Sequence, residues 1–480
     1  MSDTEKTGVT HDISTNEAKR VPKRILSGLM NSLSAGVVPR QGAPYIAIGR
    51  TDEITALLSD LDRTAEGEAA MKFLIGRYGS GKSFLIQLMR GYALERGFVT
   101  ADCNLSIERK LAGSSGAGLA TYRELIRNLA TKSSPDGGAL TQILSTWLTD
   151  IKSELVTSGF EVGTDEFNRR VKSKIFSVMH KIENDVGGFE TSYVISTYFA
   201  ACEEDDENTK SACIKYLRGE YASKRDARAF LPNVSSVVTD ANWYDRIRLL
   251  ASLFSEIGYK GLVVFIDECV NLYKIPNRIS RENNYERILT MYNNTLEGGA
   301  PHLMIIMAGT PQFLEDRRRG LFSYEALHSR LSDGKFGGGD YINMMGPVIR
   351  LKRLSKSELL ALVLRVTSLH SQYYGWTPRI SEDDPEKFVT ACLSMAGADI
   401  MVTPREIIRD YIHVLNILYQ NPTAVFSEIV KSDVTLAPSG EGDDDLVISD
   451  DEDEDMETKS RREPEQRRGS SSFDPNDIII

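Results

Sequence analysis

One glycine-rich loop constrains the fold of this chain more than any other feature. Gly76 is followed, after four residues, by Gly81-Lys82-Ser83, which is the GxxxxGK[ST] pattern known as Walker A. The apolar residues 73–75 before it predict a buried strand, and the residues after Lys82 predict a helix. Glycines let the loop turn its N–H groups inward, and the helix N-terminus adds a positive dipole end. The alternative is a glycine turn that matches the pattern by accident.

The pattern predicts a nucleotide bound through its phosphates, with ATP and Mg²⁺ as the expected ligands. Lys82 can place its ammonium group on the β- and γ-phosphates, so it is also a catalytic candidate. The Ser83 hydroxyl can ligate Mg²⁺. The predicted nucleotide-binding residues of this loop are Gly76, Arg77, Tyr78, Gly79, Ser80, Gly81, Lys82, Ser83 and Phe84.

A second motif, of the Walker B type, follows much later in the chain. The continuous apolar run 261–266 predicts a parallel strand buried on both faces, and it ends in Asp267 and Glu268. Ligands bind at the carboxyl ends of such strands. We expect Asp267 to hold Mg²⁺ through water, and Glu268 to orient and polarise an attacking water. A strand followed by an acidic helix cap is the alternative for this run taken alone.

Residues 303–308 predict a further buried strand, which ends at Gly309-Thr310-Pro311. A polar residue at the tip of the strand beside Asp267 can hydrogen-bond the γ-phosphate or the attacking water, which makes Thr310 the sensor candidate. A threonine that begins the next turn is the alternative. Residues 348–351 are the candidate fifth strand. Together these segments predict an α/β fold: a P-loop NTPase with a parallel sheet of the AAA+ or ASCE type.

Arginine completes many phosphoryl-transfer sites, because its planar guanidinium matches phosphate oxygens. Arg330 lies in a helical segment between the last two predicted strands and is the candidate finger that reaches a neighbouring copy. The run Arg317-Arg318-Arg319 lies there too, although such clusters are usually solvated surface. Arg405 opens a helix that begins with a capping box, Thr403-Pro404-Arg405-Glu406. It is a second sensor candidate, with a surface salt bridge as the alternative.

The residues before the glycine loop predict a helix over 24–35 and a short strand over 45–48. Gly49-Arg50-Thr51-Asp52-Glu53 follows, and Thr51 or Asp52 is the expected cap of the next helix. This Gly-Arg-x-x-Glu segment is similar to one that borders the nucleotide base in many ATPases of the extended AAA+ and STAND groups. That similarity makes Arg50 a candidate nucleotide-binding residue.

The predicted organisation has a disordered N-terminus at 1–23 and an ATPase domain at 24–353. The ATPase domain contains a mostly helical insertion at about 130–240, because the interval between the two motifs exceeds what a P-loop core needs. A helical lid spans 354–431, and residues 432–480 form a disordered acidic tail. The helices expected in the insertion are 141–156, 166–182, 193–202 and 210–217.

The net charge of −11 is concentrated in the tail. Residues 441–457 carry eleven acidic residues and no basic one, and residues 458–480 add one net positive charge, so residues 1–440 carry −1. This balance neither favours nor excludes nucleic acid, so any DNA contact would be local. The candidate segment is basic and follows the second motif, with a solvated loop as the alternative. Its basic residues are Lys274, Arg278, Arg281 and Arg287.

The cysteines show no metal-binding or disulfide pattern. They are scattered without paired spacing, at Cys103, Cys202, Cys213, Cys269 and Cys392. This placement argues against a zinc site or a disulfide framework and favours a reducing cytoplasm. No apolar run approaches the length of a membrane span, so we expect a cytoplasmic protein without membrane contact.

The tail ends in an apolar stretch that includes Phe473 and Ile478-Ile479-Ile480. An apolar end on an acidic disordered segment suggests a peptide that docks in a groove of a partner protein. An inert solubilising tail is the alternative.

The pattern as a whole resembles the bacterial ATP-binding proteins of BREX-type and Shango-type anti-phage systems. The resemblance spans about residues 24–421, and Tyr216-Leu217-Arg218-Gly219-Glu220 and Gly258-Tyr259-Lys260-Gly261-Leu262 are its most discriminating segments. Its other segments are residues 24–39, Gly49-Arg50, the glycine loop, Tyr122-x-Glu124-Leu125, Asp267-Glu268, Gly309-Thr310-Pro311, Ser323-Tyr324-Glu325-Ala326-Leu327 and Thr403-Pro404-Arg405.

That family is similar to AAA+ ATPases related to origin-recognition proteins. The resemblance implies a self-associating ATPase that works beside a helicase and, in the Shango-type case, a TerB-domain protein. The expected function is ATP hydrolysis that powers or licenses a multi-protein defence complex on DNA. The alternatives are an ATP-dependent switch or scaffold with slow hydrolysis, and a helicase-loader or initiator-like ATPase that binds DNA directly.

Overall fold

The computed structural model describes residues 21–113, 116–182, 187–333, 343–394 and 403–432. The predicted disordered N-terminus and the acidic tail, with its predicted docking peptide, lie almost entirely outside these residues. Within them, no helix is both long and apolar enough to cross a membrane.

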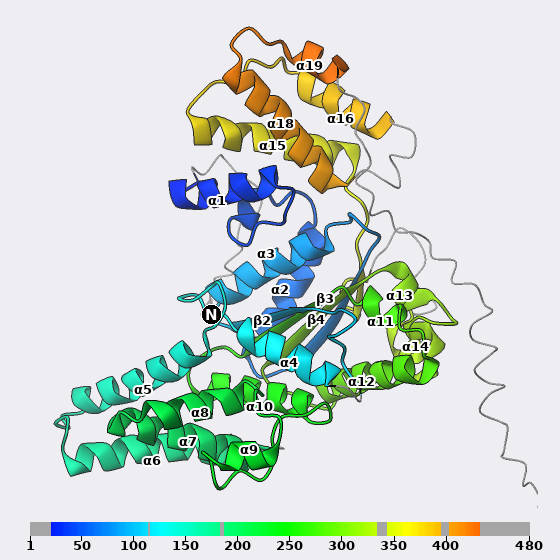
Figure 1. The fold of residues 1–480 in the computed structure, drawn as a ribbon. Helices are drawn as coiled ribbons and strands as arrows, with labels where there is room; N and C mark the ends of the chain where they lie inside the picture. Colours follow the sequence, from blue (N-terminus) through cyan, green and yellow to red (C-terminus); the bar gives the residue numbers. More distant parts are fainter. Residues whose placement is uncertain (1–20, 114–115, 183–186, 334–342, 395–402, 433–480) are drawn as a thin grey trace, which may run out of the picture. The chain divides into compact units, whose positions relative to one another are not determined.

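A five-stranded parallel sheet lies at the centre of the fold (Figure 1). Ile75 pairs with Gly309 and Asn104 with Asp267, so neighbouring strands end together at one edge of the sheet. This arrangement confirms the α/β class and the predicted fifth strand. In the order β2-β3-β4-β1-β5, the strands are β1 (Ala70–Ile75), β2 (Val99–Asn104), β3 (Leu262–Asp267), β4 (Leu303–Gly309) and β5 (Val348–Arg350).

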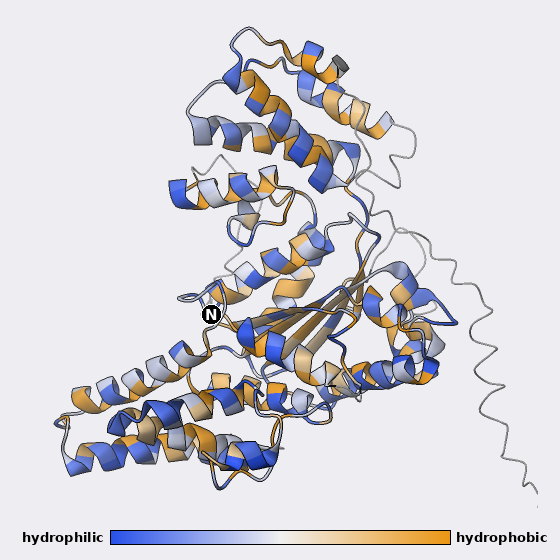
Figure 2. Cartoon of the chain, in the orientation of Figure 1, coloured by the Kyte–Doolittle hydropathy of each residue, from blue (hydrophilic) through white to orange (hydrophobic). Residues whose placement is uncertain are grey.

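The strands are mostly apolar, as their colours in Figure 2 show, and each face of the sheet belongs to a hydrophobic cluster. Leu74 and Phe265 belong to the hydrophobic layer formed with α2 (Thr51–Ala65) and α3 (Lys82–Glu95). Their neighbours along the strands alternate to the opposite face, as expected for strands buried on both sides.

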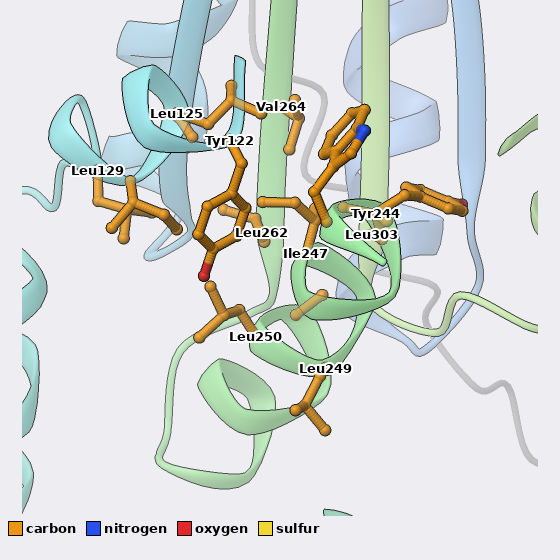
Figure 3. Packing of buried hydrophobic residues seen from close by; sticks show 14 of the residues in the cluster. Tyr122, Leu125, Leu129, Tyr244, Ile247, Leu249, Leu250, Leu262, Val264 and Leu303 are labelled. Atoms are coloured by element: carbon orange, nitrogen blue, oxygen red, sulfur yellow. The ribbon is translucent and has the colours of Figure 1, made fainter. Parts of the chain in front are cut away.

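Three helices cover that opposite face: α4 (Ala117–Arg127), α10 (Trp243–Glu256) and α12 (Arg278–Leu296). Figure 3 shows Tyr122 of α4 and Ile247 of α10 near Leu262 and Val264 of β3. Helix α10 was not predicted, although it supplies much of this layer.

Helices fill the interval between α4 and α10. Arg246 of α10 is buried there and donates to Thr191 Oγ1 at 3.0 Å and to Ser236 Oγ at 3.1 Å, which joins α10 to the inserted helices. The four helical segments predicted for this interval are confirmed. The inserted helices are α5 (Leu140–Thr157), α6 (Asp165–Ile182), α7 (Gly188–Glu204), α8 (Glu207–Leu217) and α9 (Lys224–Arg228).

Short helices follow β3 and β4, and a further helical group follows β5. The short ones are α11 (Val270–Tyr273) after β3, then α13 (Pro311–Glu315) and α14 (Glu325–Leu331) after β4. The helical group consists of α15 (Lys356–Tyr374), α16 (Asp384–Ser394), α18 (Pro404–Gln420) and α19 (Phe426–Ser432).

The C-terminal helical group shares one hydrophobic core with α1 (Lys23–Ser34), which comes from the opposite end of the described chain. Leu29 of α1 is fully buried in this core together with Val363 and Leu415. The domain boundaries stay predictions, but this core joins the first described helix to the last ones.

The segment before α2 differs from the prediction. Residues 45–48 do not form a strand, because Ala43–Tyr45 form a 3-10 turn. The predicted cap at Thr51 or Asp52 is also wrong. Helix α2 begins at Thr51, and its N-cap is Arg50, whose φ of 65° lies in the left-handed region.

Candidate nucleotide-binding site

The glycine loop runs from the end of β1 to the start of α3. Gly79 and Gly81 have φ angles of 73° and 88°, which favour glycine because a Cβ is strained in the left-handed region. Gly76 is required for space, since a Cβ there would collide with Ser80 Oγ. Tyr78, at the tip of the loop, is 50% exposed. The predicted loop therefore forms, and each of its three glycines has a physical reason.

Lys82 closes over the loop that precedes it. Its ammonium group donates to the carbonyl oxygens of Gly76 at 2.7 Å and Arg77 at 3.0 Å. These bonds place a positive charge across the mouth of the loop, where the helix N-terminus also presents N–H groups. The arrangement suits an anion such as a phosphate group.

Two residues from distant parts of the sequence meet beside the loop. The Ser83 hydroxyl donates to Asp267 Oδ2 at 2.7 Å, because β3 ends at the same edge of the sheet as β1. The other carboxylate oxygen accepts the Glu268 N–H at 2.8 Å, and Asp267 is only 9% exposed. A hydroxyl and a carboxylate are hard oxygen donors, and Mg²⁺ is usually held by one or two such protein groups with waters. The pair therefore fits the predicted metal site.

Glu268 has an unusual backbone. Its φ of 58° lies in the left-handed region, and its side chain is exposed at the carboxyl edge of the sheet. The next residue fixes this turn, since the Cys269 N–H donates to Ala308 O at 3.0 Å. Backbone strain of this kind costs about 1–3 kcal/mol and tends to occur at functional sites.

Burial raises the pKa of the Cys269 thiol well above its usual range, so this cysteine stays protonated at neutral pH.

Thr310 lies at the tip of β4, next to β3. Its hydroxyl oxygen accepts the Phe313 N–H at 3.4 Å, so it is the N-cap of α13. This is the turn-initiating role weighed as the alternative for this residue. A sensor role stays a prediction.

Arg330 lies on the exposed surface of α14. Its guanidinium donates to Asn293 Oδ1 at 3.0 Å and to Ala326 O at 2.9 Å, so it lies against α12 and its own helix. A contact with the nucleotide of a neighbouring copy stays a prediction.

The start of α18 lies against the glycine loop. Thr403 Cγ2 is 2.7 Å from the position that a Cβ on Gly79 would occupy. The predicted capping box is confirmed: Thr403 accepts the Glu406 N–H, and Glu406 accepts the Thr403 N–H. Arg405 is exposed, and its side-chain stem lies near Gly36. The structure therefore brings Thr403 to the loop, although this residue was not predicted for the site. The capping-box pattern was the one sequence signal at this position.

The Arg50 side chain also reaches the loop, where it binds a main-chain carbonyl oxygen. Its guanidinium donates to Ser80 O at 2.9 Å and to Lys352 O, and it forms an ion pair with Glu53 at 3.0 Å. Gly49 beside it packs closely against the Glu358 carboxylate at the start of α15. Arg50 therefore joins the start of α2 to the glycine loop and to the segment after β5.

Most of the basic segment after the second motif is helical, since Arg278, Arg281 and Arg287 belong to α12 and only Lys274 lies in the turn before it. Arg281 is 3% exposed and donates to Ile275 O at 2.7 Å and Pro276 O at 3.2 Å. It is therefore a buried structural residue and does not offer its charge to DNA. Lys274 and Arg278 of the same segment are exposed.

Two segments that carry the family resemblance pack together. The Tyr122 hydroxyl donates to Leu217 O at 2.7 Å, and Arg123 Nε donates to Gly219 O at 2.7 Å. Gly219 has a φ of 68°, and a Cβ there would lie 3.1 Å from the Tyr122 ring. The Tyr-Leu-Arg-Gly-Glu segment thus fastens the inserted helices to α4 beside the sheet.

One known protein family matches most of this chain. The family model described as BREX system ATP-binding protein BrxC/D matches residues 21–434. A search of curated proteins finds no significant match. The family match covers all of the described residues and confirms the resemblance to BREX-type ATP-binding proteins. The chain therefore belongs to the family of BREX system ATP-binding proteins BrxC/D.

Proposed function

We propose that this chain hydrolyses ATP in a Mg²⁺-dependent reaction and that hydrolysis powers or licenses a multi-protein anti-phage complex. The observation that carries the proposal is the contact of Ser83 with Asp267 at 2.7 Å, with Glu268 next to it at the open edge of the sheet. A phosphate-binding loop, a metal site and a water-activating carboxylate are the parts that such a reaction needs.

Each residue has a proposed task. The loop N–H groups and the Lys82 ammonium bind the phosphates and stabilise the negative charge that develops on them. Mg²⁺, when bound, neutralises charge on the β- and γ-phosphate oxygens. Ser83 and Asp267 would hold that ion, and Glu268 would orient the attacking water and accept its proton. For Thr310, at the neighbouring strand tip, the proposed task is contact with the same water.

Self-association is proposed to complete the site, with Arg330 of one copy reaching the γ-phosphate bound by the next. Its exposure on α14 supports this role. The proposed partners, taken from the family resemblance, are a helicase and a TerB-domain protein. For direct DNA contact, the exposed residues Lys274 and Arg278 are the proposed phosphate contacts.

A nucleotide-dependent switch with slow hydrolysis is the second candidate. The contact of Thr403 with Gly79 supports it, because a loop that rearranges around a nucleotide would move the C-terminal helices. The two candidates differ in turnover and share nucleotide binding.

Purified protein, alone and with duplex or single-stranded DNA, tests the proposal through ATP binding and ATP turnover. Lys82→Ala is expected to lose both. Glu268→Gln is expected to keep ATP binding and lose about 10²–10⁴-fold in turnover, the range for removal of a general base. Glu297→Gln, on the exposed end of α12, is the matched control. Tight binding without turnover under every condition would favour the switch, and no ATP binding would refute both candidates.

A further inference from the structure

We propose that Arg50 is a positioning residue that fixes the orientation of the Gly81 N–H in the phosphate-binding loop, and that it does not recognise the nucleotide base. This inference rests on the proposed nucleotide-binding function of the loop. In this role Arg50 acts on the nucleotide site by holding a carbonyl oxygen of the loop backbone.

The first argument is how fully the guanidinium is engaged. The Arg50 side chain is 12% exposed, as is that of Glu53, its ion-pair partner at 3.0 Å. The Arg50 guanidinium also donates to the backbone carbonyls of Ser80 and Lys352. A planar guanidinium held at three points cannot rotate toward a base without giving up one of these bonds.

The second argument is the geometry of the peptide that Arg50 holds. Nη2 donates to Ser80 O at 2.9 Å, and Ser80 is joined to Gly81 by a planar trans peptide. In a trans peptide the C=O and the following N–H point in opposite directions, so holding the Ser80 oxygen also aims the Gly81 N–H. Gly81 is the N-cap of α3, where N–H groups without a helical partner are available to an anion.

The third argument is that the loop needs an external constraint at this point. Gly81 has a φ of 88°, and nothing lies within 4 Å of the position that a Cβ would occupy there. Neighbouring side chains therefore do not hold the residue in place by packing. Arg50 itself is rigid, because it is the N-cap of α2 with a φ of 65° and its guanidinium is tied to Glu53 within the same helix.

Binding of Mg·ATP, Mg·ADP and Mg·GTP to the full chain tests the proposal. Arg50→Gln is expected to weaken ATP and ADP binding about tenfold, since bonds to a charged donor are lost, while the ratio of ATP to GTP affinity stays unchanged. Arg50→Lys, which can hold one carbonyl at a time, is expected to lose less. Arg63→Gln, on the exposed end of the same helix, is the control. A changed ATP-to-GTP ratio would show a base contact, and unchanged ATP affinity would remove the positioning role.

Hydrogen exchange of the nucleotide-free protein gives a second readout that does not depend on the proposed function. Arg50→Gln is expected to speed exchange in peptides covering 76–85, whereas Arg63→Gln leaves them unchanged. Faster exchange confined to α2 would mean that Arg50 only stabilises its own helix, and the inference would fail. If the wild type binds no nucleotide, the proposed function fails, while this experiment still decides whether Arg50 orders the loop.

Discussion

Thr403, the cap of α18, lies directly against Gly79 of the glycine loop, with its Cγ2 2.7 Å from where a Cβ on residue 79 would be. The start of α18 therefore contacts the loop at Gly79 through the Thr403 side chain. The contact leaves no room for a larger residue at position 79.

Gly79→Ala is expected to weaken ATP binding at least about tenfold and to lower stability by about 1–3 kcal/mol, because it adds both a left-handed strain and a collision with Thr403. Gly375→Ala measures the strain alone, since φ is 66° there and nothing lies within 4 Å. Thr403→Ser removes the methyl group but keeps the capping hydroxyl. Adding it to Gly79→Ala should restore part of the loss, and no recovery would argue against the collision.

Asp267→Asn and Ser83→Ala each remove one of the two oxygen groups beside the loop. Each is therefore expected to raise the Mg²⁺ concentration at the midpoint of ATP binding by about 10- to 100-fold. The measurement is a Mg²⁺ titration of ATP binding at fixed nucleotide concentration. Asp62→Asn, at a 64% exposed site on α2, is the matched control. An unchanged Mg²⁺ midpoint in both variants would place the metal elsewhere.

Arg281→Ala and the double change Lys274→Ala with Arg278→Ala are expected to separate stability from DNA binding. Arg281→Ala leaves the carbonyls of Ile275 and Pro276 without this donor, so it should lower the free energy of unfolding by about 1–3 kcal/mol in a urea titration. The double change should stay within about 0.5 kcal/mol of the wild type.

The same variants test the proposed DNA contact. If Lys274 and Arg278 bind phosphates, the double change should lower the slope of log affinity against log salt by about 2. An identical salt slope would exclude these two residues from the DNA interface.

His370 predicts a pH dependence for the C-terminal helices. The ring is completely buried, and Trp376 Nε1 donates to its Nδ1 at 2.9 Å, so the ring proton lies on Nε2, 3.0 Å from Asn416 Oδ1. Burial lowers the pKa of His370 below its ordinary value of about 6.5, and the bond to Asn416 opposes this shift. Protonation of Nδ1 would place two N–H groups face to face.

At a pH between the pKa of His370 in the folded chain and its higher pKa in the unfolded chain, only the unfolded chain binds the proton. The free energy of unfolding therefore keeps this contribution in full above about pH 6.5 and loses it as the pH falls. The loss is at most about 1.4 kcal/mol per pH unit. Melting temperatures at pH 7.5 and 5.5 measure it. His370→Gln should flatten this dependence, whereas the exposed His180→Gln should not. Equal pH dependence in the wild type and His370→Gln would contradict the assignment.

The sequence predicted those parts of the site that depend on a short stretch of chain. The glycine loop needs only the spacing from Gly76 to Ser83, and the capping box of α18 needs only residues 403–406. The meeting of Ser83 and Asp267 could also be expected, because parallel strands end at a common edge.

The parts that failed depend on tertiary contacts. Arg281 looks like a surface residue in a polar segment, and only the turn at 275–276 shows why it is buried. Residues 45–48 are a continuous apolar run typical of a buried strand, but they are not among the five strands of the described sheet. The contact of Thr403 with Gly79 depends on how the C-terminal helices pack, which no local pattern encodes.

The shared core of α1 with α15 and α18 also sets an order of events during synthesis. Leu26, Leu29 and Leu33 are made before the strands of the sheet, whereas their partners in α15 and α18 are made after those strands. The sheet can assemble in the meantime, whereas α1 must wait with its apolar side uncovered. In a chain that stops before α18, the apolar side of α1 would stay exposed to solvent. Aggregation or proteolysis is therefore the expected fate of such truncated copies.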